Sequence, residues 1–220
     1  MLTRLAVAAS LLASVVVAHP AAAQYRVRSG WSQPSPPTDP SITPYFGYMN
    51  LGHYVDGPLG TSATGGEAAL VGAQVMLPLT PFFALVGNAA HANSNMVFFE
   101  PTGGGPTLGN SGGWMFDGDL QLSSPFRGSG GHWIDPFIQL GAGAMRYSTQ
   151  NTLGDESATN FAFNVGLGLD YSITRNVGLQ ILGKDYIGHW NITPQFPFQS
   201  GDRYTNNYAI SAGLSLGLAR

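Results

Sequence analysis

The segment from Asn160 to Thr174 alternates strictly between apolar residues and small or polar ones. Its apolar positions are Phe161, Phe163, Val165, Leu167, Leu169, Tyr171 and Ile173. Successive side chains of a strand point to opposite faces, so the alternation predicts a β-strand with one apolar side. The other side carries mostly Gly, Ala, Ser and Asn, which suits the interior of a small barrel better than a surface in water. The pattern therefore predicts that the apolar side faces lipid.

Similar strand-like stretches occur along most of the chain. The predicted strands are Thr43 to Tyr54, Glu67 to Leu77, Phe82 to Ala92, Gly113 to Leu122, Asp135 to Ser148, Asn160 to Ile173, Val177 to Trp190 and Asn207 to Leu218. Each reaches the length of about 9–11 residues that a tilted strand needs to cross a bilayer. An even number of strands of similar length predicts an all-β fold, an eight-stranded antiparallel up-and-down transmembrane β-barrel.

The connections between these strands alternate in length. The long ones are 55–66, 93–112, 149–159 and 191–206; the short ones are 78–81 and 174–176, while 123–134 is intermediate. Outer-membrane barrels have short periplasmic turns and longer outer loops. The alternation therefore predicts that the end with the long connections faces outward.

One stretch offers a rival interpretation, because residues 68–99 contain no Asp, Glu, Lys or Arg and resemble a transmembrane helix in hydropathy. Pro78 and Pro81 interrupt the stretch, and Val and Phe favour strands in both arms. We therefore predict two strands joined by a tight turn.

The N-terminal region has a different character. Residues 1–23 combine Arg4, an apolar run and a small-residue Ala triplet, which is typical of a secretory signal peptide; an uncleaved membrane anchor is the alternative. Residues 24–42 are rich in Pro and predict a flexible tail. The predicted barrel domain then spans residues 43–220.

Composition narrows the function classes. Charged residues make up 10% of the chain, against about 25% in a typical soluble domain. The net charge of -3 offers no basic surface, so no nucleic-acid partner is expected. With no Cys, the chain has no disulfide framework and no thiolate metal site.

Three stretches carry a family resemblance: residues 43–48 (TPYFGY), 135–143 (DPFIQLGAG) and 164–171 (NVGLGLDY). In these the chain resembles the small eight-stranded outer-membrane β-barrels of Gram-negative bacteria, the OmpA-like and OmpW-like group. The resemblance implies the cell outer membrane as location. It also implies contact with outer-membrane lipid and lipopolysaccharide, insertion by the barrel-assembly machinery, and a monomer.

Polar residues on the less apolar strand faces are the candidate site. They are Asp117, Asp119, Gln121, Gln139, Asn164, Asp170, Gln180 and Lys184. Because an eight-stranded barrel is only wide enough for side chains, we expect a structural network of hydrogen bonds and ion pairs in the lumen. The alternative is a narrow polar path or a small ligand site.

Catalysis and metal binding are weakly indicated. Asp117 and Asp119 share a face and could form a catalytic pair, but pairing with a cation such as Lys184 is the simpler interpretation. A lipid A deacylase would need Ser, His and an acid, and only His91 with Ser94, or His189 with Asp185, could be combined. His53, His91, His132 and His189 lack metal-ligand spacing. We therefore predict no enzyme activity, no cofactor and no metal.

Aromatic residues near the predicted strand ends are explained most simply as interfacial girdles, with a sugar-binding platform as the alternative. They are Tyr45, Trp114, Trp133, Phe137, Tyr147, Tyr171, Tyr186 and Trp190.

The sequence thus predicts an integral outer-membrane barrel with a structural or surface-interaction role. Two alternatives stay open: a narrow channel for small or apolar solutes, and a soluble periplasmic barrel that binds an apolar ligand with its Phe and Leu faces turned inward.

Overall fold

The computed structural model describes residues 39–51, 53–56, 62–65, 67–99, 107–128, 132–151, 154–174, 176–190 and 203–218. All of them belong to one compact unit, Ser35–Arg220. The predicted signal peptide and residues 24–38 of the predicted tail lie outside the described residues. In the part of the chain described, no helix is long and apolar enough to cross a membrane.

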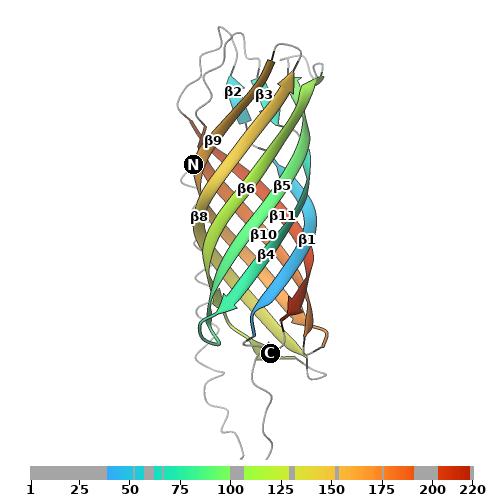
Figure 1. The fold of residues 1–220 in the computed structure, drawn as a ribbon, viewed down its shortest axis with the longest axis vertical. Coiled ribbons are helices and arrows are strands. Elements are labelled where there is room, and N and C mark those ends of the chain that lie inside the picture. Colours follow the sequence, from blue (N-terminus) through green and yellow to red (C-terminus); the bar gives the residue numbers. More distant parts are fainter. Residues whose placement is uncertain are drawn as a thin grey trace, which may run out of the picture. The chain divides into compact units, whose positions relative to one another are not determined.

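Eight long strands form the wall of a barrel (Figure 1). They are β1 Ser41–Asn50, β4 Glu67–Pro78, β5 Phe83–Phe99, β6 Thr107–Ser123, β8 Trp133–Asn151, β9 Gly154–Ser172, β10 Val177–Trp190 and β11 Arg203–Gly217. Three short strands are β2 His53–Asp56, β3 Ser62–Gly65 and β7 Phe126–Arg127.

Antiparallel ladders close this wall. The order is β5-β4-β1-β11-β10-β9-β8-β6, and β6 pairs with β5 to complete the ring. β1, the first long strand, pairs with β4 on one side and with β11, the last strand, on the other. The first and last strands are therefore neighbours in the ring. The predicted eight-stranded up-and-down barrel is confirmed, and so are two strands and a turn in place of a helix over residues 68–99.

The register of the ladders tilts the strands. The path of paired residues that starts at Ser41 passes Met76, Val86, Asp119, Gly141, Asn164, Tyr186 and Asn207. It returns to β1 beyond Asn50, whose partner is Tyr208. A barrel of this strand number needs such a stagger to close. The path also sets Asp119, Asn164 and Tyr186 on one row of the inner wall.

The two ends of the barrel differ. The turn end carries the connections 79–82 and 173–176, which are tight: Leu79 N donates to Phe83 O, and Ile173 N donates to Val177 O. At the opposite end, the loop end, β2 and β3 form a small hairpin, and β3 pairs with the last residues of β5.

Three predicted long loops are wrong in extent. Most of 93–112 continues β5 and β6, every described residue of 149–159 is strand, and residues 203–206 belong to β11. Backbone groups alone make a ladder, so the Asn, Ser and Gly of these segments extend it without an apolar face. Residues 103–105, three consecutive Gly in the predicted loop 93–112, lie outside the described residues. β1 also begins at Ser41, so Ser41 and Ile42 belong to the barrel wall instead of the tail.

The apolar faces of the strands point outward. Phe163 and Leu167 of β9 and Ile210 of β11 are exposed, whereas Asn164 and Ser211 next to them are buried. The interpretation as a soluble barrel with inward Phe and Leu faces is therefore wrong. The small and polar residues fit inside because the interior has little volume.

Candidate functional site

Alternation along β6 places every second side chain in the lumen. Met115, Asp117, Asp119 and Gln121 are buried, while the residues between them point outward. The chain changes face at every residue, so consecutive odd positions of β6 line one wall of the interior. Two carboxylates are thereby placed where water is largely excluded.

The positive charge of Lys184 compensates these two carboxylates. Its Nζ lies 2.5 Å from Asp117 Oδ1 and 2.6 Å from Asp119 Oδ2. The exposed fractions of the three side chains are 3% or less. Lys184 belongs to β10, across the lumen from β6, so the ion pairs bridge the interior. Burying such charges is costly unless they are paired and hydrogen-bonded, as they are here.

Hydrogen bonds extend this group to β1 and β5. The Tyr45 hydroxyl donates to Asn88 Oδ1 at 2.7 Å, and Asn88 Nδ2 donates to Asp117 Oδ2 at 2.7 Å. The Tyr186 hydroxyl donates to the same Asp117 oxygen at 3.3 Å. We call these residues, with Lys184 and Asp119, the Lys184 cluster. It connects four strands of the wall and fills the middle of the lumen.

A layer of three glutamines lies toward the turn end. Gln139 Nε2 donates to Gln121 Oε1 at 3.0 Å and to Gln74 Oε1 at 3.4 Å. Gln121 Nε2 in turn donates to Ser123 Oγ at 3.0 Å. Gln139 has no exposed surface at all. This layer places neutral amides from β4, β6 and β8 inside the lumen.

Glycines on the facing strands make room for the long polar side chains. Gly141 pairs with Asp119, and a Cβ at Gly141 would collide with the Asp119 carboxylate. A Cβ at Gly166 would lie 3.1 Å from Leu182 Cδ1, which is a tight contact, and 3.4 Å from Lys184 Cγ. The Gly positions of the alternating pattern therefore supply space that the polar side chains occupy.

Toward the loop end the lumen becomes apolar. Met49, Leu51, Leu70, Met115 and Met145 are all buried there and pack with small Ala residues. Met fills irregular space well, because its side chain is unbranched. The interior thus changes from polar at the turn end to apolar at the loop end.

Seven of the eight predicted lumen residues form three groups, and Asn164 is the eighth. Asp117, Asp119 and Lys184 form one group, and Gln121 and Gln139 form another. Gln180 Nε2 donates to Asp170 Oδ2 at 3.2 Å nearer the turn end. Asn164 is buried beside the Asp119 carboxylate.

Four aromatic residues predicted to form interfacial girdles are instead buried in the lumen: Tyr45, Phe137, Tyr147 and Tyr186. Alternation along the strand already indicated an inward position, since Tyr186 shares its face with Lys184 and Gln180. Gln74 and Asn88 follow the same rule and were also missed. Trp114 and Tyr171 are exposed, Trp133 is half-buried, and the side chain of Trp190 lies outside the described part.

The combinations considered for catalysis are not assembled among the described side chains. The His91 ring stacks on Trp114 at 4.7 Å between centroids, on the outer wall. The side chains of Ser94 and His189 lie outside the described part. Lys184 engages both Asp117 and Asp119, so these carboxylates are not an open acid–base pair. Among the described residues, no group of three or more His, Asp or Glu is placed to hold a metal ion.

Comparisons with known proteins give a likeness in structure only. No protein-family model matches the chain, and no curated protein matches it. Neisserial surface protein A matches with a TM-score of 0.56 and 11% identity, covering 81% of this chain and 97% of that one. Outer membrane protein OprG from Pseudomonas aeruginosa matches with a TM-score of 0.56 and 14% identity, covering 82% and 97%.

A third similar structure is that of outer membrane protein AlkL in lipid bilayers. It matches with a TM-score of 0.50 and 15% identity, covering 90% of this chain and 97% of that one. Together with the closed ladder of eight antiparallel strands, these matches show that the chain has the fold of the small eight-stranded outer-membrane β-barrels.

Proposed function

We propose that this protein is an integral outer-membrane β-barrel with a structural or surface-interaction role and a sealed lumen. The observation that carries the proposal is the inverted arrangement of its side chains. Large apolar residues cover the outside, and the buried interior holds the charges of the Lys184 cluster. This arrangement is stable where lipid surrounds the barrel.

An apolar belt runs around the whole wall. Each of the eight long strands contributes exposed apolar residues, for example Phe46, Val71, Leu85, Phe116, Leu140, Phe163, Ile181 and Ile210. Phe46 is 73% exposed, and Phe163 and Ile210 are each 61% exposed. Soluble monomers rarely expose contiguous apolar patches larger than a few hundred Å². Outer-membrane lipid, including lipopolysaccharide in the outer leaflet, is the partner that this belt fits.

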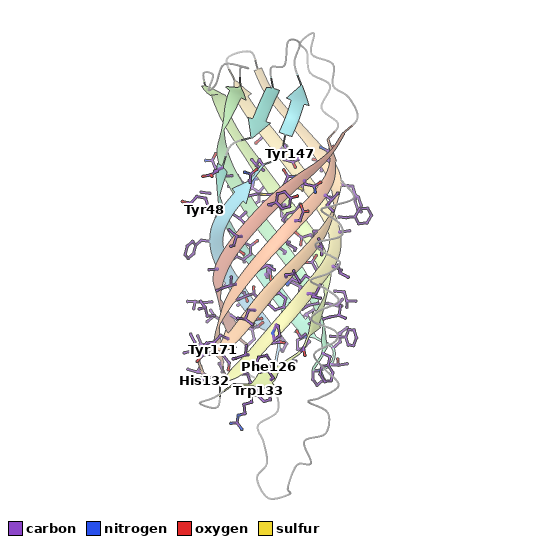
Figure 2. The ribbon with its side chains drawn as sticks, turned by 180° about the vertical axis from the view of Figure 1, so that it is seen from behind. Tyr48, Phe126, His132, Trp133, Tyr147 and Tyr171 are labelled. Carbon is purple, nitrogen blue, oxygen red and sulfur yellow. The ribbon has the colours of Figure 1, made fainter. Side chains whose placement is uncertain are left out.

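Aromatic and amphipathic residues mark the turn end of the belt. Phe126, His132, Trp133 and Tyr171 lie together there (Figure 2). The His132 and Tyr171 rings are 5.4 Å apart between centroids, and His132 Nδ1 contacts Ser172 O at 2.9 Å. Rings with a polar end favour the boundary between hydrocarbon and water. This group supports a membrane boundary near the turns.

The closed wall supports a monomer. In a barrel the neighbouring long strands pair around the ring, so the spanning part offers no free edge to a second copy. Insertion would then depend on the machinery that assembles such barrels, as for the group that the chain resembles.

A narrow channel for apolar solutes is the second candidate, and the apolar loop half of the lumen favours it. An apolar solute that enters from the loop end would contact Met49, Leu51 and Met115. The Lys184 cluster and the three glutamines block a straight path beyond them. Transport would therefore require these layers to move.

Two measurements test the proposal. A denaturing gel of the outer-membrane fraction, run with and without boiling, should show a heat-dependent shift, since a closed barrel resists detergent until it is heated. Purified protein in planar bilayers should give no reproducible conductance. A soluble, unshifted band would overturn the membrane location, whereas steady single-channel currents would favour the channel over the sealed barrel.

A further inference from the structure

A small cavity opens at the turn end of the barrel, beyond the Asp170–Gln180 pair. Its volume is about 90 Å³, and its lining includes Ser41, Trp133, Asp135 and Asp170, with Asp39 also contributing. The cavity is large enough for a small ion with a few water molecules.

Two carboxylates meet in this cavity. Asp135 on β8 and Asp170 on β9 are direct partners in the ladder, and both lie on the inward face. Asp135 Oδ1 accepts a hydrogen bond from Ser124 N at 3.0 Å, and Asp170 Oδ2 accepts one from Gln180 Nε2 at 3.2 Å. Like charges directly opposite each other destabilise a strand pair. A cation between them would remove this repulsion.

Unpartnered oxygen atoms provide an independent observation. Ser41 on β1 lines the cavity from another strand and is only 5% exposed, yet its Oγ has no hydrogen-bond partner. Asp170 Oδ1 is also enclosed and also has none. Buried polar side-chain atoms nearly always have a partner, so two such atoms on the lining of one cavity indicate that ordered water or a ligand occupies it. Both are oxygens, and one is anionic.

We propose that this cavity binds a hard divalent cation, Ca²⁺ or Mg²⁺. Asp170 Oδ1, the Asp135 carboxylate and the Ser41 hydroxyl would supply the protein ligands, and water molecules would complete the shell. Hard divalent cations prefer oxygen ligands, and Mg²⁺ in particular keeps several waters beside one or two carboxylates. Fewer than three acidic ligands therefore suffice for a partly hydrated ion. The ion would link β1 to β8 and β9 at the end where the strands emerge.

Terbium luminescence can locate the ion directly. Full-length protein, refolded in a non-ionic detergent free of lipopolysaccharide and treated with EDTA, is titrated with Tb³⁺ and excited through tryptophan. Trp133 lines the cavity and should sensitise a bound ion. Trp133→Phe should abolish the emission, while Trp114→Phe, which alters an exposed tryptophan of the outer wall, should leave it unchanged. Added Ca²⁺ should displace Tb³⁺.

Ligand variants then test the coordination. Asp170→Asn should weaken Tb³⁺ binding by at least about tenfold, because the number of charged ligands sets the affinity of such sites. Asp185→Asn removes the same charge at a distant position of β10 and should change nothing. Equal binding by Asp170→Asn and the unmodified protein would overturn the proposal.

Other outcomes would also overturn it. Emission that survives Trp133→Phe would place the ion elsewhere. Displacement by Na⁺ at matched ionic strength, or by arginine but not by Ca²⁺, would assign the cavity to a monovalent or guanidinium group. If Asp170→Asn does not fold, the Trp133 and Trp114 pair still decides the case, because neither change touches a proposed ligand.

Discussion

Replacing Lys184 with Met tests the interior most directly. Met is similar in length and keeps the packing against neighbouring side chains, but it removes the only cation of the Lys184 cluster. Two ion pairs of 2.5 and 2.6 Å are lost together, and two buried carboxylates remain. Removing one partner of a buried ion pair costs about 3–5 kcal/mol, so we expect Lys184→Met to lower the free energy of unfolding by at least that amount.

The two carboxylates should respond differently in the Lys184→Met background. Asp117 Oδ2 keeps its hydrogen bonds from Asn88 and Tyr186, whereas Asp119 Oδ2 loses the hydrogen bond from Lys184. A second change, Asp119→Asn, should therefore restore more stability than Asp117→Asn. Equilibrium unfolding in urea, with the barrel in lipid vesicles and followed by the heat-dependent gel shift, measures all variants. A loss below about 1 kcal/mol for Lys184→Met would refute the reasoning, because that is the range of exposed pairs.

Three further changes probe the wall and the lumen with the same unfolding assay. Leu167→Arg should cost about 2–4 kcal/mol if Leu167 faces the middle of the bilayer, and Leu167→Ala should cost less; equal losses would count against a lipid-facing side chain. Gly141→Ala should cost about 1–3 kcal/mol through overpacking against Asp119, while Gly118→Ala, where an added Cβ meets nothing within 4 Å, should be nearly neutral. Tyr45→Phe leaves the buried Asn88 Oδ1 without its donor and should cost about 1–3 kcal/mol, and an unchanged midpoint would show that the oxygen finds another partner.

The architecture could be predicted because strand periodicity is a local property. The exposed Phe163 and Leu167 and the buried Asn164 follow from alternation alone, without knowledge of the neighbouring strands. The tight turn at 79–82 was equally local, since Pro78 and Pro81 favour it. Strand ends at the loop end were not predictable in this way, because Asn93 to Asn95 join the ladder opposite Gly112 to Asn110 without an apolar pattern.

The composition of the lumen was predicted better than its contacts. Alternation along a strand decides whether a side chain points into the lumen. The stagger between neighbouring strands decides its position along the barrel axis, and hence which side chains it contacts. Tyr45 and Asn88 meet Asp117 only because β1, β4, β5 and β6 are offset by particular amounts. Aromatic residues were assigned to the membrane boundary by their place near strand ends, although the parity of Tyr147 and Tyr186 already indicated the interior.

The pairing of Lys184 with Asp117 and Asp119 shows why a barrel interior can carry charge at all. β10 and β6 are not neighbours in the ring, since β9 and β8 separate them. The ion pairs therefore form across the lumen, over the space that Gly141 and Gly166 leave free on the two strands between. Small residues on β8 and β9 and long polar residues on β6 and β10 are thus parts of one arrangement. A methyl group at Gly141 would collide with the Asp119 carboxylate, which is one partner of Lys184. The small residue on β8 and the ion pair between β6 and β10 therefore depend on each other, and this dependence couples the three strands.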